Sequence, residues 1–251
     1  MRFTLLVGKS FVVTSVRTDK LRSVWESRVD QWEATVETSE AFARVRDRML
    51  ELAKPRAADR CLDLGAGTGM LTLPLADQVA AVTAADISAG MLASLAAAAQ
   101  HDRNEVATRT APMEELHFAA ASFELVVSNY AMHYLTHADK DVILRRIRRW
   151  LVPGGRLVIG DMMIGRSLDE HHRRVLWEKG LVMLRRGPAG WWRLLKNIMR
   201  IGTGKGRLRP AAPEWWTTAL AEAGFEGVRY EHVVSEAGIV TGTTPFVNST
   251  M

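Results

Sequence analysis

Three glycines that follow a carboxylate are the residues best suited to bind a ligand in this chain of 251 residues. The run reads Asp63-Leu64-Gly65-Ala66-Gly67-Thr68-Gly69, with an apolar stretch on either side. Glycine adopts backbone angles that a Cβ disfavours, and its bare backbone lets a ligand approach the free N–H groups at a helix N-terminus. We therefore expect a strand at 60–64, a tight binding loop, and a helix that begins near Met70.

The next candidate is Asp86, which ends the apolar run 80–85 about twenty residues after the loop, where a carboxylate can accept hydrogen bonds from both hydroxyls of a ribose. Its alternative role is to cap a helix, although Ser88 could cap the helix predicted at 91–100 instead. The dinucleotide fingerprint G-x-G-x-x-G does not fit, because Gly69 comes one residue early. The pattern therefore favours a nucleoside ligand other than NAD or FAD.

A sheet is needed to hold these residues. Apolar runs at 60–64, 80–85, 105–110 and 123–129, and the run up to Asp161 after Pro153-Gly154-Gly155, alternate with helical patterns. A helix at 214–224 and strands at 228–235 and 238–243 follow. This order predicts an α/β fold with a doubly wound, mostly parallel sheet and a terminal antiparallel hairpin.

Two amphipathic helices are predicted before the first strand, at 21–37 and 40–54. Trp25 and Trp32 lie on the apolar face of the first one. We expect most residues of these helices, both tryptophans included, to pack against the sheet.

Four stretches, in order, resemble the motifs of the class I S-adenosylmethionine-dependent methyltransferases, in particular the small-molecule, methyltransferase type 11-like members. They are the glycine loop, then 111–118, similar to Gly-Asp-Ala-Glu-Glu-Leu-Pro-Phe, 123–133, similar to Phe-Asp-Leu-Val-x-Ser-Asn-x-x-x-His, and 152–161, similar to the Leu-Lys-Pro-Gly-Gly turn into strand five. The resemblance implies one methyltransferase domain over 1–251 with a Rossmann-like, seven-stranded sheet. It also implies S-adenosyl-L-methionine as cofactor, and an N-terminal arm and helices at 1–55 that close over it.

The resemblance also implies cofactor-binding roles for nine residues: Asp63, Gly65, Gly67, Gly69, Asp86, Ile87, Met113, Glu114 and Asn129. The glycines let the backbone approach the methionine part and the ribose. Asp63 orders the cofactor's amino group, Asp86 binds the ribose hydroxyls, and Asn129 lies beside the methionine end.

The adenine site departs from the family pattern. The acidic residue that contacts the adenine amino group in the family is replaced here by Pro112. We therefore expect the backbone around Met113, or apolar packing, to recognise the adenine, with Met113 and Glu114 on either side of it.

His133 is the candidate catalytic residue, because in the family strand four opens onto the transferable methyl group. A histidine titrates near neutrality, so it could act as general base toward a hydroxyl acceptor. Its alternative role is to pack under a lid, since the sequence identifies no carboxylate that would orient it. Tyr130, Tyr134 and Trp191 are the predicted substrate-pocket residues.

The segment 162–213 is too long for a simple connection and is predicted to be a basic helical insertion or lid. Between 165 and 210 it holds twelve Lys or Arg and three acidic residues. Its stretch 191–201 has one apolar and one basic helical face, which suits a lid over the substrate. It also suits peripheral membrane contact through 165–209. A nucleic-acid partner is not expected, because no recognised RNA module accompanies the charge.

The composition, 47% hydrophobic and 24% charged, is typical of one soluble globular domain. Cys61 is the single cysteine, which excludes an internal disulfide and favours a buried thiol. We therefore expect a cytoplasmic protein, which lies at the membrane surface if the insertion binds lipid. Residues 1–15 are too broken by Lys9 for a membrane span or a signal peptide, and are expected to form an extra strand or an arm. His171-His172 has no accompanying ligands, so no metal site is predicted.

We therefore predict methyl transfer from S-adenosylmethionine to a small, apolar or lipid-like acceptor. The alternatives are a non-catalytic cofactor-binding protein at a membrane surface and an RNA methyltransferase. The second lacks the Asn-Pro-Pro-aromatic signature, because Tyr130 and Ala131 follow Asn129. The acceptor atom and the oligomeric state stay open.

Overall fold

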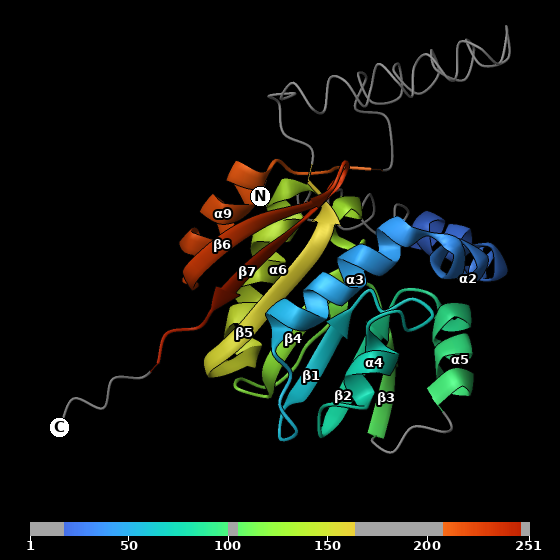
Figure 1. The fold of residues 1–251 in the computed structure, drawn as a ribbon, viewed down its shortest axis with the longest axis horizontal. Helices are drawn as coiled ribbons and strands as arrows, with labels where there is room; N and C mark the ends of the chain where they lie inside the picture. Colours follow the sequence, from blue (N-terminus) through green and yellow to red (C-terminus); the bar gives the residue numbers. More distant parts are fainter. Residues whose placement is uncertain (1–17, 100–104, 164–207, 247–251) are drawn as a thin grey trace, which may run out of the picture.

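A seven-stranded sheet forms the centre of the computed structural model, which describes residues 18–99, 105–163 and 208–246. The strands lie in the order β3-β2-β1-β4-β5-β7-β6 (Figure 1). The first five strands in this order are parallel to one another, and β7 runs antiparallel to both β5 and β6. The predicted α/β sheet with its terminal hairpin is confirmed, and the bounds are β1 Arg60–Leu64, β2 Ala81–Asp86, β3 Glu105–Thr110, β4 Phe123–Asn129, β5 Leu151–Met162, β6 Glu226–Val234 and β7 Ala237–Thr243.

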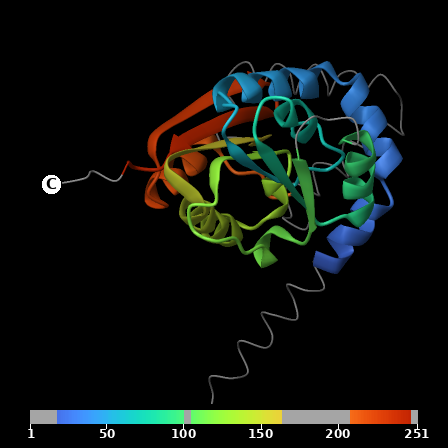
Figure 2. The same ribbon diagram turned by 90° about the horizontal axis from the view of Figure 1, so that it is seen from below.

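Helices cover both faces of the sheet. Figure 2 shows α3 and α6 on opposite sides of it. Helices α4 and α5 share the side of α3, and α9 shares the side of α6. A helix at 18–26 precedes the others, whose bounds are α2 Val29–Thr38, α3 Glu40–Ala53, α4 Thr72–Ala76, α5 Ala89–Ala98, α6 His137–Trp150 and α9 Pro213–Glu222, with short 3₁₀ turns at η2 Met113–Glu115 and η3 Met132–Tyr134.

The core lies in two layers, one on each face. Val45 and Met49 of α3 pack with Val127 on one face, and Ile147 of α6 and Trp216 of α9 pack on the other. Strands buried on both faces explain the near-continuous apolar runs of β1, β4 and β5. Cys61 is buried in the α3 layer as predicted, and burial raises the pKa of its thiol well above the ordinary value.

The predicted helix at 21–37 is wrong in one respect, because a turn at residues 27–28 divides it into two helices. The Ser27 hydroxyl donates to the Val24 carbonyl at 2.9 Å, and the Arg28 N–H donates to the Trp25 carbonyl at 3.0 Å. A serine hydroxyl that bonds the preceding turn competes with the helical backbone pattern. The apolar spacing alone did not reveal this break.

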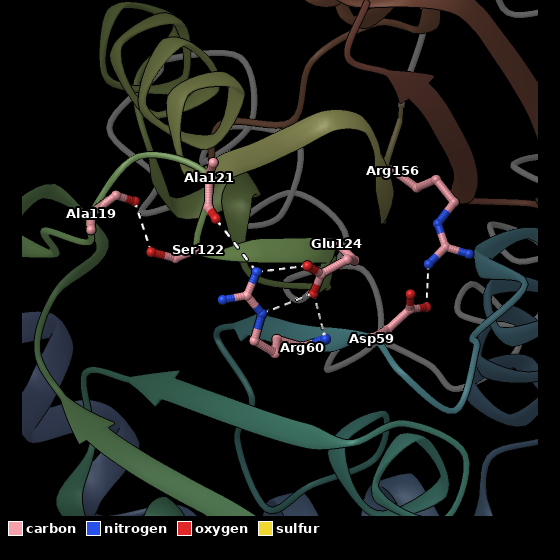
Figure 3. Close-up of polar contacts among 7 residues, drawn as sticks. All are labelled: Asp59, Arg60, Ala119, Ala121, Ser122, Glu124 and Arg156. Carbon is pink, nitrogen blue, oxygen red and sulfur yellow. Dashed lines mark hydrogen bonds and ion pairs between the residues drawn. The ribbon is translucent and has the colours of Figure 1, made fainter. Parts of the chain in front are cut away.

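Ion pairs join the elements at the amino ends of the strands (Figure 3). The Arg60 guanidinium at the start of β1 donates to the Glu124 carboxylate of β4 at 2.6 and 3.1 Å. Arg156 of β5 pairs with the buried carboxylate of Asp59. In open α/β sheets, ligands bind at the opposite, carboxyl ends of the strands.

Several sequence predictions fall outside the described residues. They are the arm at 1–15, His171-His172, Trp191 with the amphipathic stretch 191–201, and most of the insertion 162–213. Within the described ranges, no helix combines the length and apolarity that crossing a membrane requires.

Candidate functional site

The glycine loop leaves β1 at Leu64 and is tied to the end of β2. The N–H groups of Gly65 and Ala66 donate to the Ala85 carbonyl at 2.7 and 3.1 Å. Gly65 has a φ of 75°, and a Cβ on it would lie 2.2 Å from the Cβ of Ala131. The loop therefore passes too close to the chain after β4 for any side chain at this position.

The Asp86 carboxylate links the glycine loop to α5. It accepts hydrogen bonds from the N–H groups of Gly67 and Ser88, each at 2.9 Å. Burial raises the pKa of Asp86, while these hydrogen bonds oppose the rise. Ser88 is the N-cap of α5, since its hydroxyl accepts from the Met91 N–H at 3.1 Å. Ser88 therefore caps α5, and the Asp86 side chain remains in the lining of the cavity.

Asp63 lies buried at the end of β1. Its carboxylate accepts a hydrogen bond from the Thr72 hydroxyl at 2.7 Å. Burial raises the pKa of Asp63 to about 7; the Thr72 hydrogen bond lowers it and the Asp86 charge raises it further. A carboxyl group with this pKa can gain or lose its proton near neutrality when a charged ligand arrives.

One cavity of about 960 Å³, including its open mouth, joins these residues. Eight of the nine predicted cofactor residues line it: Asp63, Gly65, Gly67, Asp86, Ile87, Met113, Glu114 and Asn129. Gly69 is not part of this lining. A Cβ on Gly69 would lie 2.4 Å from Leu95, so this glycine lets α5 pack on the loop.

Aromatic side chains form an apolar wall of the cavity. Trp25 lies 5.4 Å from Trp32 and 5.8 Å from Tyr134 between ring centroids, in edge-to-face geometry. A Cβ placed on Gly67 would lie 3.3 Å from the Nε1 atom of Trp32. The expectation that both tryptophans only pack against the sheet is wrong, because they line the cavity together with the predicted Tyr130 and Tyr134. The helical spacing of Trp25 and Trp32 was the available signal.

Glu26 ties the N-terminal helix to α5. Its carboxylate accepts from the N–H groups of Ala89 at 2.7 Å and Gly90 at 3.1 Å. The Ser88 N–H donates to the Asp86 carboxylate, and the Met91 N–H donates to the Ser88 hydroxyl. The first four N–H groups at the start of α5 therefore all have acceptors. The N–H groups at a helix N-terminus need acceptors from outside the helix. Because Glu26 is one of these acceptors, its bonds also anchor the helix that carries Trp25.

His133 forms a buried pair with Asp161 at the carboxyl end of β5. The Nδ1 atom of His133 lies 2.5 Å from Oδ1 of Asp161, and the histidine side chain is 5% exposed. His133 is not among the described residues that line the cavity, but its ring packs on Tyr134, which is, with a centroid distance of 4.3 Å. No orienting carboxylate could be identified from the sequence, because Asp161 meets His133 only through the pairing of β4 with β5.

Asn129 and Tyr130 line the cavity and also carry polar atoms that are buried without partners in the described chain. Asn129 is 8% exposed, and within the described chain neither its Nδ2 nor its Oδ1 has a hydrogen-bond partner. The buried hydroxyl of Tyr130 likewise has none among these residues. Burial raises the pKa of Tyr130, as do the charges of Glu236 and Asp161. Buried polar groups are nearly always hydrogen-bonded, so these three atoms are exceptions within the described chain.

The lining fits a nucleoside ligand that carries positive charge. Its ionisable side chains, over the part of the chain described, include the carboxyl groups of Asp63, Asp86 and Glu114 and no Lys, Arg or His. S-adenosylmethionine carries a sulfonium and an ammonium group, which these carboxylates suit. In the same described part, no three His, Cys, Asp or Glu side chains are grouped to hold a metal ion.

Comparison with known proteins agrees with this site. The family described as Methyltransferase domain matches residues 61–155. The chain is 30% identical over 224 residues to 27-O-demethylrifamycin SV methyltransferase of Amycolatopsis mediterranei, covering 86% of this chain and 72% of that protein. It is 32% identical over 200 residues to demethylmenaquinone methyltransferase of Thermus thermophilus, covering 76% and 84%. The chain therefore belongs to the class I S-adenosylmethionine-dependent methyltransferase family.

The fold agrees with solved methyltransferase structures. Burkholderia thailandensis 1,6-didemethyltoxoflavin-N1-methyltransferase, solved with 1,6-didemethyltoxoflavin and S-adenosylhomocysteine, matches with a TM-score of 0.63 at 19% identity, covering 90% of this chain and 87% of that one. The chain spans only 56% and 57% of the length of two other curated relatives that it matches.

Proposed function

We propose that this chain transfers a methyl group from S-adenosylmethionine to a small, apolar or lipid-like acceptor. The observation that carries the proposal is that one cavity joins the glycine loop and Asp86 to an aromatic wall. A polar nucleoside end and an apolar acceptor end side by side are what such a transfer needs. A non-catalytic cofactor-binding protein, which is the alternative, would also need the nucleoside end of the cavity. The labelling assay below distinguishes the two functions.

Named residues would hold the cofactor, which supplies a methyl group made electrophilic by the sulfonium. Asp86 would accept from the ribose hydroxyls and Asp63 from the amino group. Gly65 and Gly67 line the cavity without a side chain, while their N–H groups donate to the Ala85 carbonyl and the Asp86 carboxylate. Met113 and Glu114 would flank the adenine. With the cofactor held in this way, the protein has to align the acceptor and exclude water.

The aromatic wall supports an apolar acceptor. Trp25 and Trp32 come from the N-terminal helices, and Tyr134 comes from η3, so the acceptor end closes only when these elements pack together. Flat aromatic faces offer large apolar contact to a planar or lipid-like molecule. The Thermus thermophilus relative is named for an action on demethylmenaquinone, which fits this class.

His133 is proposed as the base that takes a proton from a hydroxyl acceptor. Because Asp161 binds Nδ1, the imidazole would carry its proton there and leave Nε2 to accept another. A histidine oriented by a carboxylate is the arrangement that general base catalysis favours.

Peripheral membrane contact through 165–209 in a cytoplasmic protein remains part of the proposal, supported by the basic charge of that sequence. Sedimentation with vesicles of anionic phospholipid at low salt tests it. Binding that disappears in 0.5 M salt, an ionic strength at which the Debye length falls to about 4 Å, would support an electrostatic contact. A protein that stays in the supernatant at low salt would exclude it.

Transfer of label tests the function. The purified chain is incubated with S-adenosylmethionine labelled on the methyl group and a bacterial extract, and label is counted in organic, aqueous small-molecule, RNA and protein fractions. We expect label in the organic fraction, lost in Asp86→Ala. Label in RNA would overturn the acceptor class, and no label despite measured cofactor binding would favour the non-catalytic alternative.

A further inference from the structure

We infer that Lys140 is a positioning residue for methyl transfer, because its side chain holds the turn that carries His133 and Tyr134 beside the cavity. The inference rests on the proposed function, since it concerns the residue proposed as base. Lys140 lies in the first turn of α6 and does not itself belong to the described lining of the cavity.

The ammonium group of Lys140 is buried and bridges two backbone carbonyls. The residue is 0% exposed. Its Nζ atom donates to the Leu135 carbonyl at 2.8 Å and to the Arg209 carbonyl at 2.7 Å. Leu135 is the C-cap of η3 and lines the cavity, and Arg209 belongs to the chain that leads into α9. One side chain therefore joins three segments: α6, η3 and the approach to α9.

The backbone of Arg209 completes this connection. Its N–H donates to the His133 carbonyl at 2.6 Å. The carbonyls on either side of Tyr134, those of His133 and Leu135, are thus both held by one short network. The network fixes the backbone from which the His133 ring reaches Asp161 and the Tyr134 ring reaches the aromatic wall.

The stability of α6 does not account for the charge of Lys140. The first turn of a helix disfavours a cation, because the helix macrodipole is positive there. Thr136 and Asp139 already cap this helix with a capping box. Burying an ammonium group also costs free energy, and apolar side chains can often replace buried ionic groups without loss of stability. An apolar side chain, however, could not donate to the two carbonyls.

Two tryptophans of α9 complete the surroundings of the ammonium group. The Nζ atom of Lys140 lies 5.9 Å from the ring centroid of Trp215 and 5.9 Å from that of Trp216. A cation at this distance from an aromatic face is attracted by the ring quadrupole. The rings therefore stabilise a cation at the position from which it donates to both carbonyls.

Label transfer tests the role, with the organic fraction of the bacterial extract as acceptor and S-adenosylmethionine at saturation. Lys140→Met keeps a side chain of similar length and removes the donors. We expect the transfer rate to fall about 10- to 100-fold, because a small misplacement of a reacting group has effects of this size. Affinity for S-adenosylhomocysteine, measured by calorimetry, should stay within about twofold of the wild-type value, because Asp63 and Asp86 lie on β1 and β2.

A double variant separates positioning of His133 from general support of the fold. If Lys140 acts through His133, Lys140→Met should lower the rate by no more than about twofold in a His133→Ala background. A merely structural role would give the same loss in both backgrounds. Arg156→Met is the stability control, because it also disturbs a buried ion pair, at the amino ends of the strands, and it should transfer label at the wild-type rate.

Arg209 offers a second pair of variants that leaves the buried core untouched, because this residue is exposed. Arg209→Pro removes the N–H that donates to the His133 carbonyl. The transfer rate should fall about three- to tenfold, as expected for the loss of one hydrogen bond. Arg209→Ala keeps that N–H and should transfer label at the wild-type rate. This pair decides the question if Lys140→Met does not fold.

Three results would overturn the inference: a wild-type rate in Lys140→Met, equal losses with and without His133, or equal rates in the two Arg209 variants. An unimpaired His133→Ala variant would overturn the proposed base, and this inference with it. No transfer by the wild-type chain would overturn the proposed function itself.

Discussion

The carboxylate of Glu26 lies 2.7 Å from the backbone nitrogen of Ala89, at the first turn of α5. The same carboxylate accepts from Gly90, and Asp86 occupies the neighbouring N–H of Ser88. The helix that carries Trp25 is thus anchored beside Asp86, the residue proposed to bind the ribose. A Cβ on Gly90 would lie 2.7 Å from Glu26, so glycine is needed for this contact.

We predict that Glu26→Gln increases the release rate of S-adenosylhomocysteine about three- to tenfold. The neutral glutamine amide cannot accept the Ala89 and Gly90 hydrogen bonds as the charged carboxylate does. Losing a helix cap typically costs about 0.5–2 kcal/mol. Stopped-flow release of the ligand measures the change. Asp30→Asn, an exposed carboxylate on α2, is the matched control and should release the ligand at the wild-type rate. An unchanged rate in Glu26→Gln would show that the anchor does not limit release.

The raised pKa of Asp63 predicts a dependence of stability on pH. The folded value of about 7 exceeds the ordinary 3.8, so between about pH 4 and 7 the folded chain binds more protons here than the unfolded chain. The free energy of unfolding should therefore fall as pH rises through this window. Asp63→Asn should remove that slope in denaturant titrations at pH 5, 6, 7 and 8. A slope that persists unchanged in the variant would assign it to other groups.

The same carboxyl group predicts tighter cofactor binding as pH rises. If the ionised form holds the ligand's amino group, affinity for S-adenosylhomocysteine should increase from pH 6 to pH 8. Calorimetry in buffers of different ionisation enthalpy would detect the proton released from Asp63 at pH 6. Asp63→Asn should bind more weakly and without this proton release. Affinity that declines with pH in the wild-type chain would contradict the role.

His133 and Asp161 should act as a unit in catalysis. We expect His133→Ala to lower kcat by about 10²–10³, within the range for loss of a general base. Asp161→Asn should lower it by at least tenfold, because the amide no longer fixes the Nδ1–H tautomer. Loss of both residues should cost little more than loss of His133 alone. The affinity of Asp161→Asn for S-adenosylhomocysteine should stay at the wild-type value, and additive effects of the two substitutions on kcat would argue against coupling.

The ion pair of Arg156 and Asp59 should stabilise the fold without serving the site. Asp59 is 3% exposed, so Arg156→Met leaves a buried charge and should cost about 3–5 kcal/mol of unfolding free energy. Arg60→Met is the matched control, since its side chain is 51% exposed and an exposed pair contributes about 0–1 kcal/mol. Denaturant unfolding distinguishes the two. Both variants should bind S-adenosylhomocysteine normally while folded.

The elements were predictable where local pattern decides them. Strands β3 and β4 have the predicted bounds, and Ser88 caps α5 as its type and position indicated. Glycines, Pro-Gly-Gly and apolar runs act over a few residues, so one sequence suffices. The break at Ser27 depends on a single hydroxyl bond and was therefore missed.

The cavity was only partly predictable, because long-range pairing decides which side chains meet. Asp161 could be seen as a carboxylate at a strand end, but its contact with His133 depends on β5 lying beside β4. Glu26 reaches α5 across more than sixty residues of sequence, and exposed helical glutamates rarely indicate such a contact. Gly69 shares its motif with Gly67, yet contacts Leu95 because the chain turns away from the cavity there.

The most direct test of the account is equilibrium binding of S-adenosylhomocysteine by calorimetry, comparing the wild-type chain with Asp86→Ala and Asp86→Asn. One site per chain is predicted, with affinity reduced about 10- to 100-fold in both variants, since each loses charged hydrogen bonds of about 1.5–3 kcal/mol. Circular dichroism should confirm that the variants are folded. Wild-type affinity in both variants, or no binding to the wild-type chain, would contradict the claim that this cavity holds the methyl donor.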